Sequence, residues 1–395
     1  MIILLLIFAL VNFASAQESS VQHIKPTAPK NCCYGDGNLE HGEVAFSLPS
    51  HCFQLVCQNG LVQQQYVQKK GDKNCCEFND LLYSDGSDLG GYCMTMRCSK
   101  GEWKPSGKIE KCCDHCYIYN DPHIHTFDGH NYDWHGICNY SIAQTGFSTK
   151  PKLGVYGKFQ DCNSQASCLS YTTFKNDPNT AVTIFDREVL KPTVNGDEFV
   201  ITDSVQPLTS SSGIHPVLSW KHGDCTFLLG SSNLLLLHCR HRLDLWVHPI
   251  HSDMLNGLCG HYNQHLGDDF TRRDGTVQRP LTYWPLAFPQ SWLTSEQPDG
   301  RKCNPPCLNC NDKTIPDTTN DPCKANPGDR AKYLDLCRRS LEHLRDVEGF
   351  LQYIESCAFD VCVLYQAGGE GRQIKNWLSE VQKLVTVARN ITKTS

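Results

Sequence analysis

The sequence predicts a mostly β, disulfide-rich, multidomain protein. Small cystine-stapled modules are expected first, then a β-sandwich-like domain, then a small α-helical domain that contains cysteines. Three observations lead to this prediction. The 395 residues include 24 cysteines, far more than is usual where cellular reductants keep thiols reduced. Short apolar runs separated by turn residues fill the middle of the chain, as in sandwiches and barrels. Near the end, apolar residues recur at helical spacing.

The chain has the features of an extracellular protein. Residues 2–11 form an apolar run, and Ala14-Ser15-Ala16 supplies an A-x-A-like cleavage site, so residues 1–16 are interpreted as a signal peptide. The run is shorter than the roughly 20 residues that cross a bilayer, and we expect no membrane span. The net charge of −6 gives no basic excess for phosphate, so no nucleic-acid partner is expected. We therefore expect a secreted protein.

Two tandem copies of one small module follow a polar linker at 17–30. Pairs of adjacent cysteines recur, with a C-x4-C between successive pairs. This self-similarity near 40 residues predicts modules at 31–74 and 75–115, each too small to be stable without disulfides. Segments such as EVAFSL and LVQQQYVQ are short strand candidates. The candidate disulfide cysteines of the whole chain are Cys32, Cys33, Cys52, Cys57, Cys75, Cys76, Cys93, Cys98, Cys112, Cys113, Cys116, Cys138, Cys259, Cys357 and Cys362.

Strand-like runs dominate residues 116–295, where cysteines become sparse. Turn residues such as Asn195-Gly196-Asp197 separate these runs, so an all-β sandwich or barrel is expected here. The runs are AVTIFD at 181–186, EFVIT at 198–202, CTFLLG at 225–230, NLLLLHC at 233–239 and LDLWVH at 243–248.

The last part of the chain is expected to be helical. After a connector rich in Cys, Pro, Asn and Asp, apolar residues recur at helical spacing through a domain at 296–365, and Gly368-Gly369 interrupts the pattern. A last helix within 366–395 places an apolar stripe on one face. We interpret it as an amphipathic helix packed on its own domain, with a partner-binding or membrane-surface helix as the alternative.

Two blocks in the middle of the chain resemble a von Willebrand factor type D domain. Asp121-Pro122-His123-Ile124-His125-Thr126-Phe127-Asp128-Gly129 resembles the opening of that domain, and Gly257-Leu258-Cys259-Gly260-His261-Tyr262-Asn263 with Asp268-Asp269-Phe270 resembles its GLCG block. Ser291-Trp292 resembles its closing SW. The resemblance implies a type D domain over 116–295.

The flanking regions carry weaker resemblances. Cys357-Ala358-Phe359-Asp360-Val361-Cys362 is similar to the C-x-x-D-x-C of the eight-cysteine domain that follows type D domains, in a diverged form. The two repeats resemble short von Willebrand type C modules. This order of domains resembles the crossveinless and BMP-binding endothelial regulator family. The resemblance implies a secreted binding protein that captures a BMP-class growth factor and modulates signalling.

A second function of a different class remains open. Type D assemblies with eight-cysteine domains polymerise through intermolecular disulfides in mucin-like proteins. The chain is therefore alternatively a structural or assembly glycoprotein of mucus, egg coat or extracellular matrix, present as a disulfide-linked homo-oligomer. No G-x-S-x-G, H-E-x-x-H or phosphate loop is present, and we expect no enzyme.

A calcium site is predicted where oxygen donors converge. The stretch 261–269 offers Asn263, Asp268, Asp269 and the backbone carbonyl of His265, and hard cations take such oxygens. The type D resemblance adds Asp128 and implies that His261 replaces an Asn of the family. Weak binding is expected, on the order of the 10⁻⁴–10⁻³ M of extracellular modules.

Self-cleavage between Asp121 and Pro122 is a further prediction, because type D domains with Gly-Asp-Pro-His break at this bond. His123 would tune protonation. Asn120 stands where the family has Gly, and Asn tolerates left-handed backbone better than most residues.

Other motifs have plainer interpretations. His123, His125, His130 and His135 could form a zinc site, but satisfied or surface histidines are expected. Cys113-x-x-Cys116 and Cys307-x-x-Cys310 have zinc or redox spacing, but structural disulfides are expected. Asn139-Tyr140-Ser141 and Asn390-Ile391-Thr392 are candidate glycosylation acceptors.

Overall fold

The structure is a computed structural model, and it divides into two compact units. The first unit is Met1–Pro49 with Phe53–Val67, and the second is Ser50–Cys52 with Gln68–Ser395. The predicted signal peptide lies outside the described residues. The described residues are 30–34, 37–48, 53–66, 75–79, 81–120, 122–161, 167–186, 190–281, 285–294, 298, 300, 327–347, 349–366, 368 and 371–393.

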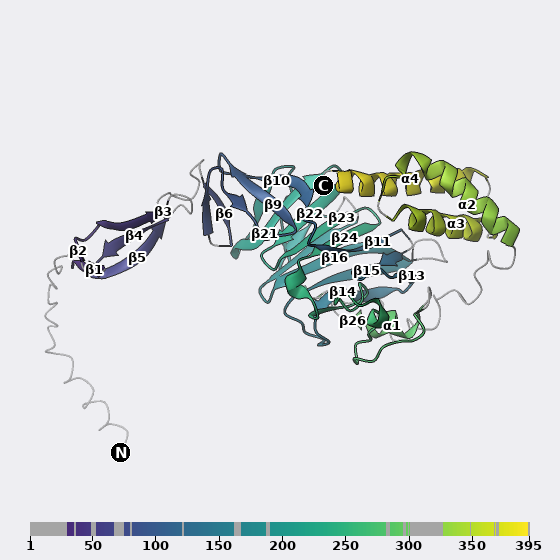
Figure 1. The fold of residues 1–395 in the computed structure, drawn as a ribbon, viewed down its shortest axis with the longest axis horizontal. Helices are drawn as coiled ribbons and strands as arrows, with labels where there is room; N and C mark the ends of the chain where they lie inside the picture. Colours follow the sequence, from purple (N-terminus) through teal and green to yellow (C-terminus); the bar gives the residue numbers. More distant parts are fainter. Residues whose placement is uncertain are drawn as a thin grey trace, which may run out of the picture. The chain divides into compact units, whose positions relative to one another are not determined.

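The first unit is a small all-β module (Figure 1). One hairpin pairs β1 (Cys32–Tyr34) with β2 (Gly37–Leu39), and a three-stranded antiparallel sheet has the order β3-β4-β5. A disulfide joins Cys32 to Cys57, both of which are buried. This bridge ties the hairpin to the sheet, as expected for a module with too little apolar surface to fold unaided. The sheet strands are β3 (Val44–Leu48), β4 (Phe53–Gln58) and β5 (Leu61–Tyr66).

A second small module opens the second unit. Disulfides join Cys76 to Cys98 and Cys93 to Cys113. Trp103 is buried at its centre and donates a hydrogen bond of 3.0 Å from Nε1 to the carbonyl of Glu77. The strands are β6 (Cys75–Phe78), β7 (Leu81–Ser84), β8 (Asp88–Leu89), β9 (Met94–Ser99) and β10 (Glu102–Ile109).

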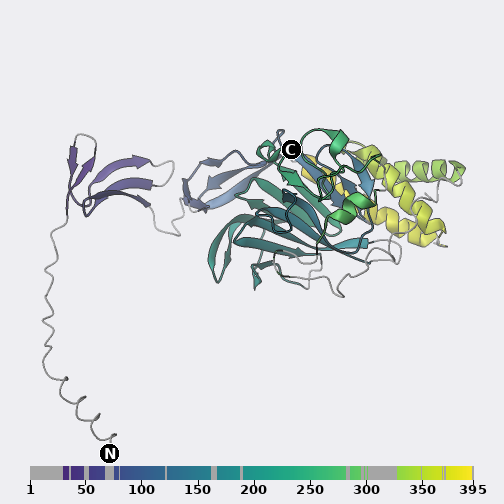
Figure 2. The ribbon, with the colours of Figure 1, turned by 90° about the horizontal axis from the view of Figure 1, so that it is seen from below.

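A sandwich of two large sheets forms the centre of the second unit (Figures 1 and 2). One sheet has the order β13-β12-β11-β24-β23-β22-β21-β20, and the other β19-β18-β17-β16-β15-β14-β25, with β26 paired to β14. The pairings are antiparallel. The first sheet contains β11 (Asp114–Tyr119), β12 (His123–His125), β13 (Asn131–Asp133), β20 (Gln206–Ser210), β21 (Gly213–His222), β22 (Cys225–Gly230), β23 (Leu234–Cys239) and β24 (Arg242–Val247).

The second sheet lies across the core from the first. Its strands are β14 (Cys138–Thr145), β15 (Gly154–Asp161), β16 (Ser167–Asp177), β17 (Thr180–Phe185), β18 (Thr193–Val194), β19 (Asp197–Glu198), β25 (Leu255–Asn256) and β26 (Leu293–Thr294). Short helices η2 (Pro249–His251), η3 (Leu266–Asp268) and α1 (Ala287–Ser291) lie in its connections.

The run of four leucines in β23 is explained by burial of both faces of its sheet. Leu234 and Leu236 pack in the core between the sheets, whereas Leu235 and Leu237 pack in a second cluster with Trp103 of the small module. Successive side chains on a strand point to opposite faces. The sequence of a strand that is buried on both faces is therefore a continuous apolar run, without alternation of apolar and polar residues.

The buried His238 of β23 predicts a loss of stability in acid. Its Nδ1 lies 3.0 Å from the hydroxyl of Thr172, its side chain is 3% exposed, and burial lowers its pKa to about 4. Because the unfolded chain binds this proton near pH 6.5 and the folded chain only near pH 4, stability falls as pH drops through that window. We expect a loss of about 3 kcal/mol between pH 7 and pH 4.

Urea denaturation at several pH values measures this effect. His238→Asn keeps an acceptor near the position of Nδ1 but cannot titrate. The free energy of unfolding of this variant should therefore fall less than that of wild type between pH 7 and pH 4, by about 3 kcal/mol. An identical pH profile in the variant would contradict the assignment.

The C-terminal helices, here called the helical region, gather at one end of the sandwich (Figure 1). A disulfide joins Cys337 of the first helix to Cys357 of the next. The apolar face of the last helix, including Leu378 and Val385, is buried in the cluster of this region. The helices are α2 (Pro327–Leu341), η4 (Glu342–Leu344), α3 (Phe350–Gln366) and α4 (Gly371–Lys393).

Helix α3 packs on the outer face of the first sheet through polar contacts. Tyr117 donates a hydrogen bond of 2.6 Å to Gln352, and Tyr119 donates one of 2.9 Å to Ser356. Buried Arg242 donates one of 2.9 Å to the hydroxyl of Tyr353. These contacts fix one face of α3 against β11 and β24.

The predicted fold class is confirmed, with corrections in detail. Of EFVIT at 198–202, only Glu198 lies in a strand, and Val200 is 70% exposed. The interpretation of the last helix as packed on its own domain agrees with its buried face. Within the described residues, no helix is both long and apolar enough for a membrane crossing.

Candidate metal centre

The two sequence blocks predicted to form a calcium site lie side by side. A disulfide joins Cys116 of β11 to Cys259, and the amide of Phe127 donates a hydrogen bond of 3.1 Å to the carbonyl of Cys259. Both cysteines are buried. The turn after β12 and the loop at 261–269 are therefore held together by a covalent and a backbone link.

The side chain of Asp128 binds backbone amides of the loop at 261–269. Its Oδ2 accepts hydrogen bonds from the amides of Asn263, at 3.2 Å, and His265, at 2.9 Å. Asn263 in turn donates from Nδ2 to Oδ2 of Asp268, at 3.0 Å, and accepts from the His265 amide, at 2.9 Å. Asp128, Asn263 and Asp268 thus form one connected group.

Asp269 is the most deeply buried carboxylate of the group. It is 0% exposed and accepts a hydrogen bond of 2.5 Å from Thr126. Burial raises its pKa to about 8; the bond from Thr126 opposes this rise, and the charges of Asp128 and Asp268 add to it. A Cβ at Gly260 would lie 1.8 Å from Asp269 Oδ1, so glycine is required beside it.

One oxygen on each of the three carboxylates is unsatisfied. Oδ1 of Asp128, of Asp268 and of Asp269 is buried without a hydrogen-bond partner. Oδ1 of Asp268 does lie 3.3 Å from Nδ1 of His265, within ion-pair range. Buried oxygens without donors are costly, and one such oxygen from each of three neighbouring aspartates fits the oxygen donor set that a hard cation takes.

The donors are not arranged as a finished coordination shell. In the part of the chain that the structure describes, no three His, Cys, Asp or Glu side chains form a complete metal-binding group. The carbonyl of His265 accepts a long hydrogen bond of 3.3 Å from the Asp268 amide. His261 points to Asn256 Oδ1, at 2.8 Å, rather than toward the carboxylates.

Only one of the two residues that form the predicted self-cleavage bond lies within the described residues. Asp121 is outside the described residues, while Pro122 is buried. Asn120 has a φ of 62°, which is the left-handed backbone conformation that Asn tolerates better than most residues. Cleavage between Asp121 and Pro122 stays a prediction.

Two of the histidines near this bond contact different polar partners. Nδ1 of His123 lies 2.7 Å from Asp133, whereas Nδ1 of His125 lies 2.6 Å from Asn131 and its ring stacks on Tyr117. These contacts agree with satisfied histidines rather than a zinc site.

The disulfide predictions are confirmed for most described cysteines, with two corrections. Cys33 and Cys112 are free and exposed, whereas all other described cysteines are disulfide-bonded. Neighbouring residues on a strand face opposite ways, so Cys32 turns inward to Cys57 and Cys33 turns outward. Cys113 and Cys116 form separate structural bridges, to Cys93 and Cys259. Cys52, Cys307 and Cys310 lie outside the described residues.

The two glycosylation candidates differ in accessibility. Asn139 is 0% exposed within β14, so its side chain is closed to solvent in the folded chain, and glycosylation there stays an untested prediction. Its triplet falls in a strand that the second sheet buries. Asn390 is exposed on α4 and stays a prediction.

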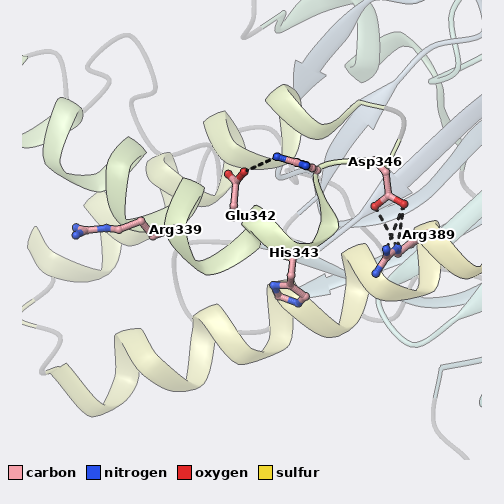
Figure 3. A pocket seen from close by; sticks show the side chains of 6 residues that line it. Arg339, Glu342, His343, Asp346 and Arg389 are labelled. Atoms are coloured by element: carbon pink, nitrogen blue, oxygen red, sulfur yellow. Dashed lines mark hydrogen bonds and ion pairs between the residues drawn. The ribbon is translucent and has the colours of Figure 1, made fainter.

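An open cleft of about 640 Å³ lies on the helical region (Figure 3). Each arginine that lines it pairs with a carboxylate, so the cleft offers no uncompensated positive charge for an anionic ligand. The pairs are Arg339 with Asp335 at 2.7 Å, Arg345 with Glu342 at 3.6 Å and Arg389 with Asp346 at 3.1 Å.

Comparison with known families gives one domain match. The model described as "von Willebrand factor type D domain" matches residues 116–276, which include both sequence blocks. Residues 116–276 form a von Willebrand factor type D domain. The predicted eight-cysteine domain at 296–365 and the type C-like modules at 31–74 and 75–115 lie outside this match and stay predictions.

The relatives compared with this chain are mucins. Mucin-6 of Mus musculus is 25% identical over 326 residues, which is 79% of this chain and 10% of that protein. Mucin-6 of Gallus gallus is 23% identical to this chain, and the match covers 85% of this chain and 27% of that protein. Mucin-5B of Homo sapiens is 24% identical, and the match covers 81% of this chain and 5% of that protein. The chain therefore spans a small part of these relatives.

The predicted function in BMP-class signalling is wrong. The compared relatives are mucins, and nothing among them supports the resemblance to crossveinless and BMP-binding endothelial regulators. The type D blocks were interpreted correctly, but the order of small modules around them was a poor guide to ligand class.

Proposed function

We propose that the chain is a secreted structural glycoprotein that assembles, through disulfides between chains, into mucus, egg coat or extracellular matrix. The similarity to mucins over 79–85% of the chain carries this proposal. The apolar run at 2–11 with its A-x-A-like cleavage site supports secretion.

Two exposed thiols supply the linking chemistry. Cys33 and Cys112 are exposed and unpaired, in a chain whose other described cysteines are bridged. In an oxidising compartment, an exposed unpaired cysteine suits intermolecular pairing. The two lie in different units of the chain, so each chain would offer two linking points.

Non-reducing gels of the secreted chain and its cysteine variants test this proposal. A chain with two linking thiols should give a ladder that collapses on reduction. Cys33→Ser or Cys112→Ser alone leaves one of the two thiols that are free among the described cysteines. Each single variant should therefore stop at a dimer, and the double variant should run as a monomer. A wild-type monomer, or a ladder that persists in the double variant, would refute the role of these cysteines.

We further propose that the type D domain holds a structural calcium ion at Asp128, Asn263, His265, Asp268 and Asp269. The unsatisfied oxygens of the three aspartates support this assignment. When bound, the cation would supply the positive charge that keeps the carboxylates ionised. The chain's own residues orient the site, because Asp128 and Asn263 fix the loop through the His265 amide.

Thermal melting in calcium and in EDTA measures the site. With a dissociation constant on the order of 10⁻³ M, 10 mM calcium should stabilise the fold by about 1–2 kcal/mol, equivalent to a few degrees. Asp269→Asn should remove this response while still accepting the hydrogen bond from Thr126. Asp274→Asn, at an exposed carboxylate in the following turn, is the matched control and should respond like wild type. An unchanged melting temperature in wild type would count against the site.

A further inference from the structure

We propose that a second cavity, here called the α4 cavity, binds a single-chain zwitterionic amphiphile, that is, one alkyl or acyl chain that ends in a phosphocholine group. The α4 cavity lies between the last helix and the adjoining ends of β22 and β23, all within the second unit. Its volume is about 450 Å³, within the range of roughly 300–1,000 Å³ of small-molecule sites. Its described lining includes neither free cysteine and no residue of the candidate metal centre, so this inference is independent of both proposed functions.

Helix α4 supplies one wall, which is apolar. Trp377, Leu384 and Val387 line the cavity, and their spacing of seven and three residues places them on one side of the helix. All three are half-buried. Leu378 and Val385 are buried more deeply, in the cluster of the helical region. Packing of the helix on its own region therefore leaves an apolar strip beside the buried face, and this strip lines the cavity.

The strand ends supply the opposite wall. The disulfide between Cys225 and Cys239 lines the cavity, with both residues buried, and its sulfur and methylene groups extend the apolar lining. Because β22 and β23 are antiparallel neighbours, Asp224 and Arg240 follow the two cysteines at the same end of the strand pair. Both side chains are exposed and line the cavity. The mouth of an apolar cavity thus carries one carboxylate and one guanidinium group.

The other charged groups of the lining are already paired. Lys383 donates a hydrogen bond of 2.9 Å to Glu380, and both belong to α4. Nδ1 of His241 lies 3.4 Å from a carboxylate oxygen of Asp186. These pairs add little net charge for a ligand to balance.

The two mouth charges select the ligand. Within the described residues, neither Asp224 nor Arg240 forms an ion pair. A guanidinium group binds phosphate through two parallel hydrogen bonds, and a quaternary ammonium group is held by a carboxylate and by the face of an aromatic ring such as that of Trp377. A phosphocholine group carries both charges, so it satisfies both side chains while its chain lies along Leu384 and Val387. A purely anionic amphiphile would be repelled by Asp224.

Isothermal titration calorimetry of the full chain with dodecylphosphocholine, below its critical micelle concentration, tests the proposal. We expect one bound molecule per chain with a dissociation constant on the order of 10 µM, as is typical of ligands of this size. Dodecyl maltoside and dodecanoate have a chain of the same length but lack the zwitterion, so each should bind at least about tenfold more weakly. Phosphocholine without a chain should also bind at least about tenfold more weakly, because it buries no apolar surface.

Three outcomes with wild type would overturn the proposal. The first is no saturable binding of dodecylphosphocholine. The second is equal affinity for dodecyl maltoside or dodecanoate, which would show that the mouth charges select nothing. The third is equal affinity for phosphocholine alone, which would show that the apolar walls hold no chain.

Variants at the exposed mouth locate the site without disturbing the core. Arg240→Gln and Asp224→Asn should each weaken binding of dodecylphosphocholine at least about fivefold and leave binding of dodecyl maltoside unchanged. Arg338→Gln, at an exposed arginine on α2 outside the described lining, is the matched control and should bind like wild type. Unchanged affinity in Arg240→Gln would overturn the assignment of the phosphate to this side chain.

A cavity-filling variant tests the apolar walls. Leu384→Trp places a larger ring in the α4 cavity, so binding of both dodecyl compounds should be lost. A thermal melt of the variant confirms that the second unit is folded, and the mouth variants decide the question if it is not. A folded Leu384→Trp variant that binds dodecylphosphocholine as tightly as wild type would overturn the proposal.

Discussion

Replacing Cys116 and Cys259 with alanine is expected to lower the free energy of unfolding of the second unit by about 5 kcal/mol. The bridge spans 143 residues, and closure of a longer loop restricts the unfolded chain more. It also ties β11 to the loop of the candidate metal centre. Urea denaturation of the oxidised protein measures the loss.

The bridge between Cys225 and Cys239 is the matched control. It spans 14 residues, so its removal should cost about 3 kcal/mol in the same entropic model. Equal losses for the two pairs would contradict a loop-length origin of the effect. The long bridge should in addition reduce the thermal response to calcium, because it positions the two site segments.

Arg242→Gln is expected to destabilise the second unit by about 3–5 kcal/mol, the cost of leaving one member of a buried ion pair uncompensated. Arg242 and Asp244 are 1% and 0% exposed. Burial opposes ionisation of Asp244, but Arg242 and His115 together lower its pKa below the usual range. The variant also loses the donor to Tyr353.

The double variant Arg242→Met/Asp244→Leu distinguishes pairing from packing. Replacing both charges with apolar side chains of similar volume removes the unpaired charge, so most of the loss should be recovered. Denaturation of the single and double variants gives the comparison. A double variant as unstable as the single one would show that the charge pair is not the cause.

Sequence periodicity predicted much of the sandwich because its core strands are covered on both faces. The leucine run at 234–237 is strand β23, and LDLWVH falls on β24. EFVIT at 198–202 has a similar composition but lies near a sheet edge, where Val200 faces solvent. Composition alone cannot tell such an edge segment from a core strand.

The sequence predicted that Asp128 belongs with the loop at 261–269, whereas calcium binding there stays a prediction. Asp128 was assigned to the loop at 261–269 from family resemblance, and the structure places its carboxylate on the amides of Asn263 and His265. Thr126, which bonds Asp269, was missed, although it stands two residues before Asp128 in the quoted block.

The contacts of the helical region with the sheet were not predicted. Gln352, Ser356 and Asp360 recur every four residues and form a polar stripe on the otherwise apolar α3, a signal visible in the sequence. Their partners on β11 and β12 lie more than 230 positions earlier. A single amino-acid sequence contains no signal that pairs such distant positions. The same limit kept Cys33 and Cys112 from being recognised as unpaired.

Disulfide mapping of the secreted material tests most directly the proposal that the chain is an assembly component. Proteolysis under non-reducing conditions, followed by mass spectrometry of a mixture of isotopically light and heavy chains secreted from the same cells, identifies bridges between chains. The account predicts mixed light–heavy peptides that contain Cys33 or Cys112, while Cys116 remains joined to Cys259 of its own chain. Only same-chain bridges, or free thiols at Cys33 and Cys112 in the secreted protein, would contradict it.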